Sequence, residues 1–171
     1  MADCHSLLIT GKSGTGKSTL LRTMAGLWPY ATGTVLAADS TLFLPQRPYL
    51  PLGTLRRAIY FPKAEAHDND EQLKAWLTRC GLGKLVNSLD EEGDWSRILS
   101  LGEQQRIAFL RILLYKPKFV FLDEATSAMD EALEKTMYEW LKDELPDTKV
   151  ISVGHRHTLY ELHDKKMALQ A

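Results

Sequence analysis

The sequence has few cysteines and little net charge, and each shortage excludes a class of protein. Its two cysteines, Cys4 and Cys80, lie far apart, without the C-x-x-C spacing of redox or zinc motifs. We therefore expect reduced thiols in a cytosolic compartment rather than a disulfide framework. The 21 basic and 22 acidic residues leave a net charge of −1. That balance gives no electrostatic basis for a nucleic-acid partner or an anionic membrane surface.

Long apolar runs are missing too. No stretch approaches the roughly 18 apolar residues that a membrane-spanning helix needs. Residues 1–5 also lack the basic-then-apolar plan of a signal peptide. We therefore expect a soluble chain. Internal repeats are absent, and a hydrophobic content of 44% over 171 residues is ordinary for one globular domain with a real core.

One stretch, residues 11–18, matches the pattern G-x-x-x-x-G-K-[ST] without a mismatch. The apolar residues 7–9 before it are typical of a short buried strand, and residues 18–25 after it favour a helix that ends near Gly26. A bare match of this kind arises by chance in about one chain in a hundred. The flanking strand and helix lower that chance, so we predict a phosphate-binding loop.

The residue types in this loop suit a nucleoside triphosphate. Its glycines let the backbone curl so that N–H groups point at phosphate oxygens, and the following helix adds the positive end of its dipole. Lys17 is placed to reach the β- and γ-phosphates, while the hydroxyl group of Ser18 can bind Mg²⁺. The residues expected to bind the nucleotide here are Gly11, Ser13, Gly14, Thr15, Gly16, Lys17, Ser18 and Thr19.

Strand and helix patterns alternate along the rest of the chain. Strands are expected at residues 6–10, 34–37, 41–44, 119–122 and 149–153, and helices at residues 55–60, 69–80, 101–114 and 130–144. This alternation predicts an α/β fold with a mainly parallel sheet flanked by helices. Residues 54–105 are polar, helical and loop-rich, which indicates an inserted helical subdomain. We expect it to interrupt a core of residues 1–53 and 106–171 within a single domain, residues 1–171.

Local signals indicate where some of these helices begin and end. Asp68 is a plausible N-cap and Gly81 a plausible stop for the helix between them. Ser100 and Glu103 form the S-x-x-E pattern of a capping box. Residues 89–94 are rich in carboxylates, which can bind a metal ion, but histidines and ligand spacing are lacking, so we favour a solvated loop.

A second acidic pattern follows the bulky apolar run of residues 119–122. Asp123 and Glu124 end this expected strand at the carboxyl edge of the sheet, where ligands bind in such folds. Asp123 is suited to hold Mg²⁺, and Glu124 to orient or deprotonate the water that attacks the γ-phosphate. The alternative is an acidic pair that merely leaves the strand for solvent. After the last long strand, His155 is placed to reach the γ-phosphate from the same edge.

Five motifs in one order resemble a known family. They are the phosphate loop, Gln46 within residues 44–49, and residues 99–106, 122–130 and 154–156. The set resembles the nucleotide-binding domain of an ATP-binding cassette (ABC) transporter over nearly the whole chain. The sequence of residues 45–56 and 99–103 most resembles that of the peroxisomal fatty-acyl-CoA half-transporters and their bacterial relatives.

The resemblance implies a P-loop NTPase fold with a RecA-like core, and it implies roles for further residues. Gln46 would be the Q-loop glutamine, which senses Mg²⁺ and the attacking water. Ser100 and Gly102 would belong to the signature motif, which caps the γ-phosphate of ATP held by a second cassette. Asp130 would be the D-loop aspartate and His155 the switch histidine. The expected catalytic residues are Glu124, His155 and Gln46, and the expected Mg²⁺ ligands are Ser18, Gln46 and Asp123.

The resemblance also implies partners and a location. Family members pair two cassettes head to tail around two ATP molecules, so we expect a homodimer that works with a transmembrane domain, without nucleic acid. The location would be the cytoplasmic face of a membrane, the bacterial inner membrane in particular. Only ten residues precede Gly11. We therefore expect the family's N-terminal antiparallel β segment, with its adenine-stacking aromatic residue, to be missing.

Other functions remain as alternatives. A soluble ABC ATPase acting on DNA, ribosomes or iron–sulfur assembly usually carries a coiled-coil insertion, a second cassette or a basic patch, and the sequence shows none of these. A nucleotide-binding module without turnover would not need Glu124 and His155. A small-molecule P-loop kinase would not need the signature or D-loop motifs. The expected function is ATP hydrolysis that powers transmembrane transport.

Overall fold

The structure is a computed structural model that describes residues 5–35, 40–67 and 69–170. It divides into two compact units. The first unit comprises Met1–Gln46 and Lys116–Ala171, and the second is Arg47–Tyr115. The predicted helical subdomain, residues 54–105, lies within the second unit. Among the described residues, no helix is both long enough and apolar enough to cross a bilayer.

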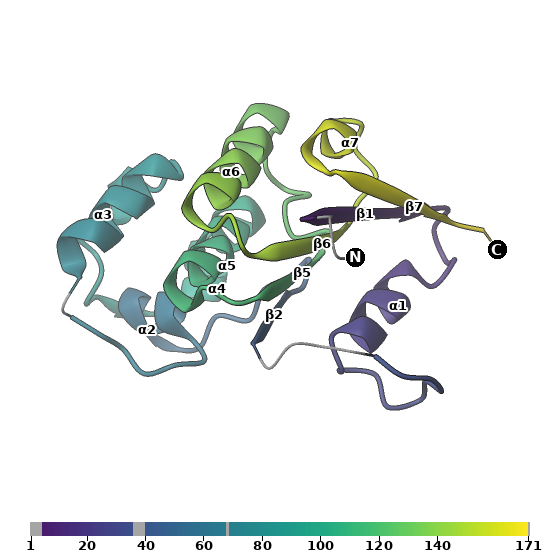
Figure 1. Cartoon of the computed structure of the whole chain (residues 1–171). Coiled ribbons are helices and arrows are strands. Elements are labelled where there is room, and N and C mark those ends of the chain that lie inside the picture. The colour runs from purple at the N-terminus through teal and green to yellow at the C-terminus, as the bar shows by residue number, and fades with distance from the viewer. Residues whose placement is uncertain (1–4, 36–39, 68, 171) are drawn as a thin grey trace. The chain divides into compact units, whose positions relative to one another are not determined.

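In the part of the chain that the structure describes, the first unit is built on a five-stranded sheet in the order β2-β5-β6-β1-β7 (Figure 1). Its strands are β1 (Ser6–Gly11), β2 (Thr41–Leu44), β5 (Phe119–Asp123), β6 (Lys149–Val153) and β7 (Lys165–Leu169). All four pairings between neighbouring strands are parallel. The α/β fold with a parallel sheet is therefore confirmed. Because the strands are parallel, all their carboxyl ends meet at one edge of the sheet.

Helices lie on both faces of this sheet (Figure 1). Helix α1 (Lys17–Met24) covers one face, and helices α6 (Glu131–Glu144) and α7 (Thr158–Leu162) lie on the other. Strands buried on both faces need apolar side chains at successive positions, and this explains the continuous apolar runs in β5 and β6. Toward α1, the buried side chains form one cluster, which comprises Ile9, Leu21, Phe121, Ile151 and Val153.

The opposite face carries a buried polar group of three side chains. Ser152 on β6 is fully buried, and its Oγ lies 3.0 Å from the hydroxyl group of Tyr138 on α6 and 2.8 Å from Nε2 of His163. His163 Nδ1 lies 2.8 Å from the carbonyl oxygen of Leu159. Because a carbonyl group only accepts, Nδ1 carries the proton and Nε2 accepts from Ser152. Burial lowers the pKa of His163, so the ring is neutral at pH 7.

This arrangement predicts a loss of stability in mild acid. The unfolded chain protonates His163 near its ordinary pKa of about 6.5, whereas the buried ring resists protonation. The free energy of unfolding should therefore fall as the pH drops below about 6.5, by at most about 1.4 kcal/mol per pH unit for this one group. Urea titrations between pH 7.5 and 5 should show a shallower decline for His163→Gln. The exposed His67→Gln is the matched control, and equal slopes for His163→Gln and wild type would contradict the assignment.

The second unit is mostly helical. Its helices are α2 (Leu55–Tyr60), α3 (Asp70–Arg79), α4 (Trp95–Ile98) and α5 (Leu101–Tyr115), with a 3₁₀ turn η1 (Gly83–Leu85). A short antiparallel pair joins β3 (Gly53–Thr54) to β4 (Glu92–Gly93). Thr54 caps α2 by accepting a hydrogen bond from the Arg57 backbone N–H, as the position of Thr54 before the expected helix predicts.

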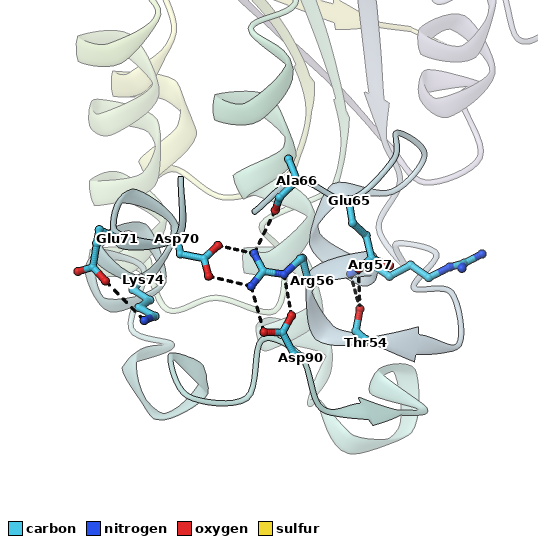
Figure 2. Close-up of polar contacts among 9 residues, drawn as sticks. All are labelled: Thr54, Arg56, Arg57, Glu65, Ala66, Asp70, Glu71, Lys74 and Asp90. Carbon is cyan, nitrogen blue, oxygen red and sulfur yellow. Dashed lines mark hydrogen bonds and ion pairs between the residues drawn. The ribbon is translucent and has the colours of Figure 1, made fainter. Parts of the chain in front are cut away.

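A buried arginine joins three segments of this unit (Figure 2). Arg56 on α2 is fully buried, and its guanidinium group donates to both carboxylate oxygens of Asp70, over 2.5 and 2.9 Å. It also donates to both oxygens of Asp90, over 2.8 and 3.2 Å, and to the carbonyl oxygen of Ala66, over 3.0 Å. These bonds hold the pKa values of Asp70 and Asp90 below their usual range. Asp90 was predicted to lie in a solvated loop. Its side chain is largely exposed, but its carboxylate also binds the buried Arg56.

Other predictions about elements differ from the structure. Thr34 and Val35 are exposed and irregular, while residues 36–37 of the strand predicted there lie outside the described residues. The predicted N-cap Asp68 also lies outside them. Asn69 occupies the N-cap position of α3 without a side-chain capping bond. Gly81 confirms the predicted helix stop, since it follows α3 with a φ of +72°.

Candidate nucleotide-binding site

The phosphate loop connects the end of β1 to the start of α1 at the carboxyl edge of the sheet. Gly16 caps the helix with a φ of +86°, a left-handed conformation that favours glycine. Gly11 has a φ of +146°, and a Cβ atom there would lie 2.6 Å from the carbonyl oxygen of Leu169. Both positions therefore exclude larger residues, which explains two of the glycines in the motif.

The side chain of Lys17 folds back over the phosphate loop. This side chain is nearly buried, and Nζ donates to the carbonyl oxygens of Gly11 and Lys12, over 3.0 and 2.8 Å. The Thr15 hydroxyl group donates to the same Lys12 oxygen over 2.9 Å. The loop thus holds the ammonium group at the helix N-terminus, where an anion is favoured by the helix dipole and the free N–H groups.

Ser18 and Asp123 meet although they lie far apart in the sequence. The Ser18 hydroxyl group donates to Oδ1 of Asp123 over 2.7 Å, and Asp123 is nearly buried at the end of β5. Arg22 Nη2 lies 3.7 Å from the other carboxylate oxygen, an ion pair that the sequence analysis missed. Oxygen donors of this kind suit Mg²⁺. No group of three or more His, Cys, Asp or Glu side chains in the described residues is arranged to hold a metal ion.

Glu124 is held between two other predicted site residues. Its backbone has a φ of +51°, uncommon for a residue with a side chain, and its N–H donates to the Val153 carbonyl oxygen over 3.0 Å. Oε2 accepts from Gln46 Nε2 over 3.0 Å, and Oε1 lies 3.3 Å from His155 Nε2. The three residues predicted to be catalytic are therefore in direct contact.

Glu124, His155 and the phosphate loop border a cavity of about 290 Å³. It is lined by Ser13, Gly14, Gly16, Lys17, Ser18, Thr19, Glu124 and His155. The helix N-terminus and ammonium group supply positive charge, and Glu124 and His155 supply groups that can accept or donate protons. A larger cavity, about 670 Å³, is lined by the start of β1, α6 and α7, at the opposite end of the strands. It contains none of the predicted site residues.

Asp130 lies apart from this cavity lining, at the N-cap of α6. Its Oδ1 accepts from the backbone N–H of Leu133 over 2.8 Å. This bond fixes the start of α6 at Glu131, seven residues after Glu124. Arg156 belongs to the predicted motif of residues 154–156, in which a role was expected for His155 alone. In the structure, Arg156 donates two hydrogen bonds to the segment between Glu124 and Asp130.

Ser100 and Gly102 belong to the second unit, at the start of α5. The predicted capping box is confirmed. The Ser100 N–H donates to Glu103 Oε2 over 2.8 Å, and the Glu103 N–H donates to Ser100 Oγ over 3.4 Å. Lys84, 2.6 Å from Oε1, together with the bonds from Ser100, lowers the pKa of Glu103 to about 2. The N-terminus of α5 is thus held rigidly by its own side chains.

The parallel sheet, the glycine-rich loop at its carboxyl edge and the Ser18–Asp123 contact define a nucleotide-binding P-loop protein. The sequence profile of the ABC transporter family matches residues 3–127. The chain belongs to that family. The domain described by this profile binds ATP.

Several known proteins resemble the chain. An uncharacterized ABC transporter ATP-binding protein of Haemophilus influenzae is 53% identical over 166 residues, which is 96% of this chain and 28% of that protein. The human lysosomal cobalamin transporter ABCD4 is 39% identical over 99% of this chain and 30% of its own length. A bacterial Atm1-family ABC exporter with ATP bound shares the fold with a TM-score of 0.81 at 23% identity, over 97% of this chain and 32% of that one. The chain therefore spans under a third of each.

Proposed function

We propose that the chain is the ATP-hydrolysing cassette of an ABC transporter, and that ATP-driven pairing of two cassettes powers transport through a membrane domain. The observation that carries this proposal is the cavity in which Lys17, Ser18, Glu124 and His155 converge. A site that only binds a nucleotide would not need the Glu124 carboxylate in the same cavity as the Lys17 ammonium group. The resemblance of the whole chain to parts of longer transporters supports the link to a membrane domain.

Each residue has a role that its position supports. The loop N–H groups and Lys17 bind the β- and γ-phosphates. Glu124 accepts a proton from the attacking water as the water oxygen bonds to the γ-phosphorus. The bond from that phosphorus to the bridging oxygen then breaks, which gives ADP and phosphate. Gln46 and His155, in contact with Glu124, orient the carboxylate and the γ-phosphate.

The Ser18 hydroxyl group and the Asp123 carboxylate would hold Mg²⁺, which neutralises charge on the phosphates when bound. Gln46 is a further candidate ligand. Its hydrogen bond to Glu124, which lines the cavity, supports this role. Ser100, Gly102 and Asp130 are proposed to act toward ATP bound by a second copy. The membrane domain would set the location, at the cytoplasmic face of a membrane such as the bacterial inner membrane.

ATP-dependent pairing tests this function. Light scattering of Glu124→Gln should show the mass doubling when Mg-ATP is added, because the variant binds ATP without consuming it. Adding Lys17→Ala removes a charge-assisted contact with the phosphates and should weaken ATP affinity roughly ten- to a hundredfold, so pairing is lost. A Glu124→Gln protein that binds ATP yet stays monomeric would contradict the two-cassette site. A protein without ATP affinity would contradict the nucleotide site itself.

A further inference from the structure

Arg156 reaches back to the backbone that follows Glu124. Its Nη1 donates to the carbonyl oxygen of Met129 over 2.6 Å, and its Nη2 donates to that of Ser127 over 2.7 Å. The two bonds use the fixed fork of the guanidinium group, which can serve two acceptors at once. Arg156 directly follows His155, and its two acceptors lie shortly after Glu124. The two bonds therefore connect the segment that follows His155 to the segment that follows Glu124.

Glu134 reinforces the same connection from inside α6. Its side chain is 1% exposed, so its charge requires close partners. Oε1 accepts from the Thr126 hydroxyl group over 2.6 Å, and Oε2 accepts from the Thr158 hydroxyl group over 2.8 Å. Arg156 Nη1 lies 3.8 Å from Oε2. One buried carboxylate therefore bonds to both segments, residues 126–130 and 155–158.

We propose that Arg156 and Glu134 are positioning residues that hold these two segments as a single body, so that Glu124 and His155 keep their mutual contact. The left-handed backbone at Glu124 needs such support, because strained conformations persist only where their surroundings fix them. Within the segment, the Ser127 N–H donates to the Glu124 carbonyl oxygen and the Met129 N–H to the Thr126 carbonyl oxygen, and the bonds from Arg156 and Glu134 attach this turn to the rest of the unit. The functional part of this inference rests on the proposed hydrolysis.

Arg156→Lys is the sharpest test, because lysine keeps the positive charge near Glu134 but lacks the fork that bridges two carbonyl groups. Hydrogen exchange of the full chain, followed by mass spectrometry, should become at least about tenfold faster in peptides covering residues 126–130. Peptides from β1 and β6 should not change. Turnover of ATP should fall about ten- to a hundredfold, while the Kd for Mg-ATP stays within about threefold, because the loop that binds phosphate is untouched. Glu134→Gln should shift both measurements in the same direction.

Lys135→Ala is the control on the same helix, since Lys135 pairs with Glu139 over 3.8 Å on the exposed surface. It should match wild type in exchange and turnover. Unchanged exchange of residues 126–130 in Arg156→Lys would overturn the inference, whatever the turnover. Faster exchange with turnover equal to an active wild type would overturn the positioning role. A wild-type protein without turnover would instead contradict the proposed function, and the exchange data would then decide the inference alone.

Discussion

Glu124→Gln should lower ATP turnover by roughly a hundredfold or more, the range expected when a general base is removed. The substitution keeps the size of the side chain and leaves an oxygen that can accept from Gln46, which now bonds Oε2 over 3.0 Å. What it removes is the negative charge and the capacity to take a proton from water. The strained backbone at this position is retained, because glutamine tolerates it no better and no worse than glutamate.

The measurement is phosphate release at saturating Mg-ATP, with a parallel titration of nucleotide affinity. We expect the Kd for ATP to stay within a few fold of wild type, because Glu124 lines the cavity but is not part of the phosphate-binding loop. Glu131→Gln is the matched control. Glu131 is exposed in the first turn of α6 and should not affect turnover. Near-normal phosphate release by Glu124→Gln would remove Glu124 from the catalytic role.

Arg56→Ala should destabilise the protein by about 3 kcal/mol, the lower end of the range for breaking a buried ion pair. The guanidinium group is fully buried and serves Asp70, Asp90 and the Ala66 carbonyl group (Figure 2). Its loss leaves a void and two carboxylates without their shared cation. The effect is at the lower end because Asp70 and Asp90 are partly exposed and can be hydrated. For a chain of this length, the loss corresponds to roughly 6–12 °C in Tm.

Calorimetry and urea titration would measure this change. Arg97→Ala is the control, because Arg97 is 87% exposed and pairs with Asp94 at the surface, where an ion pair contributes little. Arg56 also lowers the pKa values of both aspartates, so wild type should lose stability as the pH falls below about 4, when the unfolded chain takes up protons first. Arg56→Ala should weaken that acid dependence. If the free energy of unfolding of Arg56→Ala is within about 0.5 kcal/mol of the wild-type value, the packing of the second unit does not depend on Arg56.

The sequence predicted the elements that have strong local signals. Apolar runs of strand length marked β1, β5 and β6, and the capping box at Ser100 marked the start of α5. The edge strand β7 was missed because it opens with Lys165 and Lys166, which give it no apolar run. An edge strand has a neighbour on one side only, so its sequence is less constrained.

The contacts within the candidate site were predictable only in part. That Asp123 would face the phosphate loop followed from its place at a strand end, because parallel strands bring their carboxyl ends together. The contacts of Arg56 and Arg156 were not predictable. Their partners lie 10 to 34 residues away in the sequence, and no local pattern distinguishes an arginine that will be buried from one that will be exposed. The roles assigned to the site residues remain predictions.

The strand order also determines when the nucleotide site can form during synthesis. Within the described part of the chain, β1 pairs with β6 and β7, so that Ser6 lies beside Val150 and Leu7 beside Lys165. Among the described strands, β1 is synthesised before β6 and β7 and must wait for both, whereas Arg47–Tyr115 is continuous in sequence and can collapse earlier. A nascent chain that stops short of β6 has a phosphate loop on a strand that lacks both of its neighbours, so ATP can stabilise the site only after β6 and β7 have paired with β1.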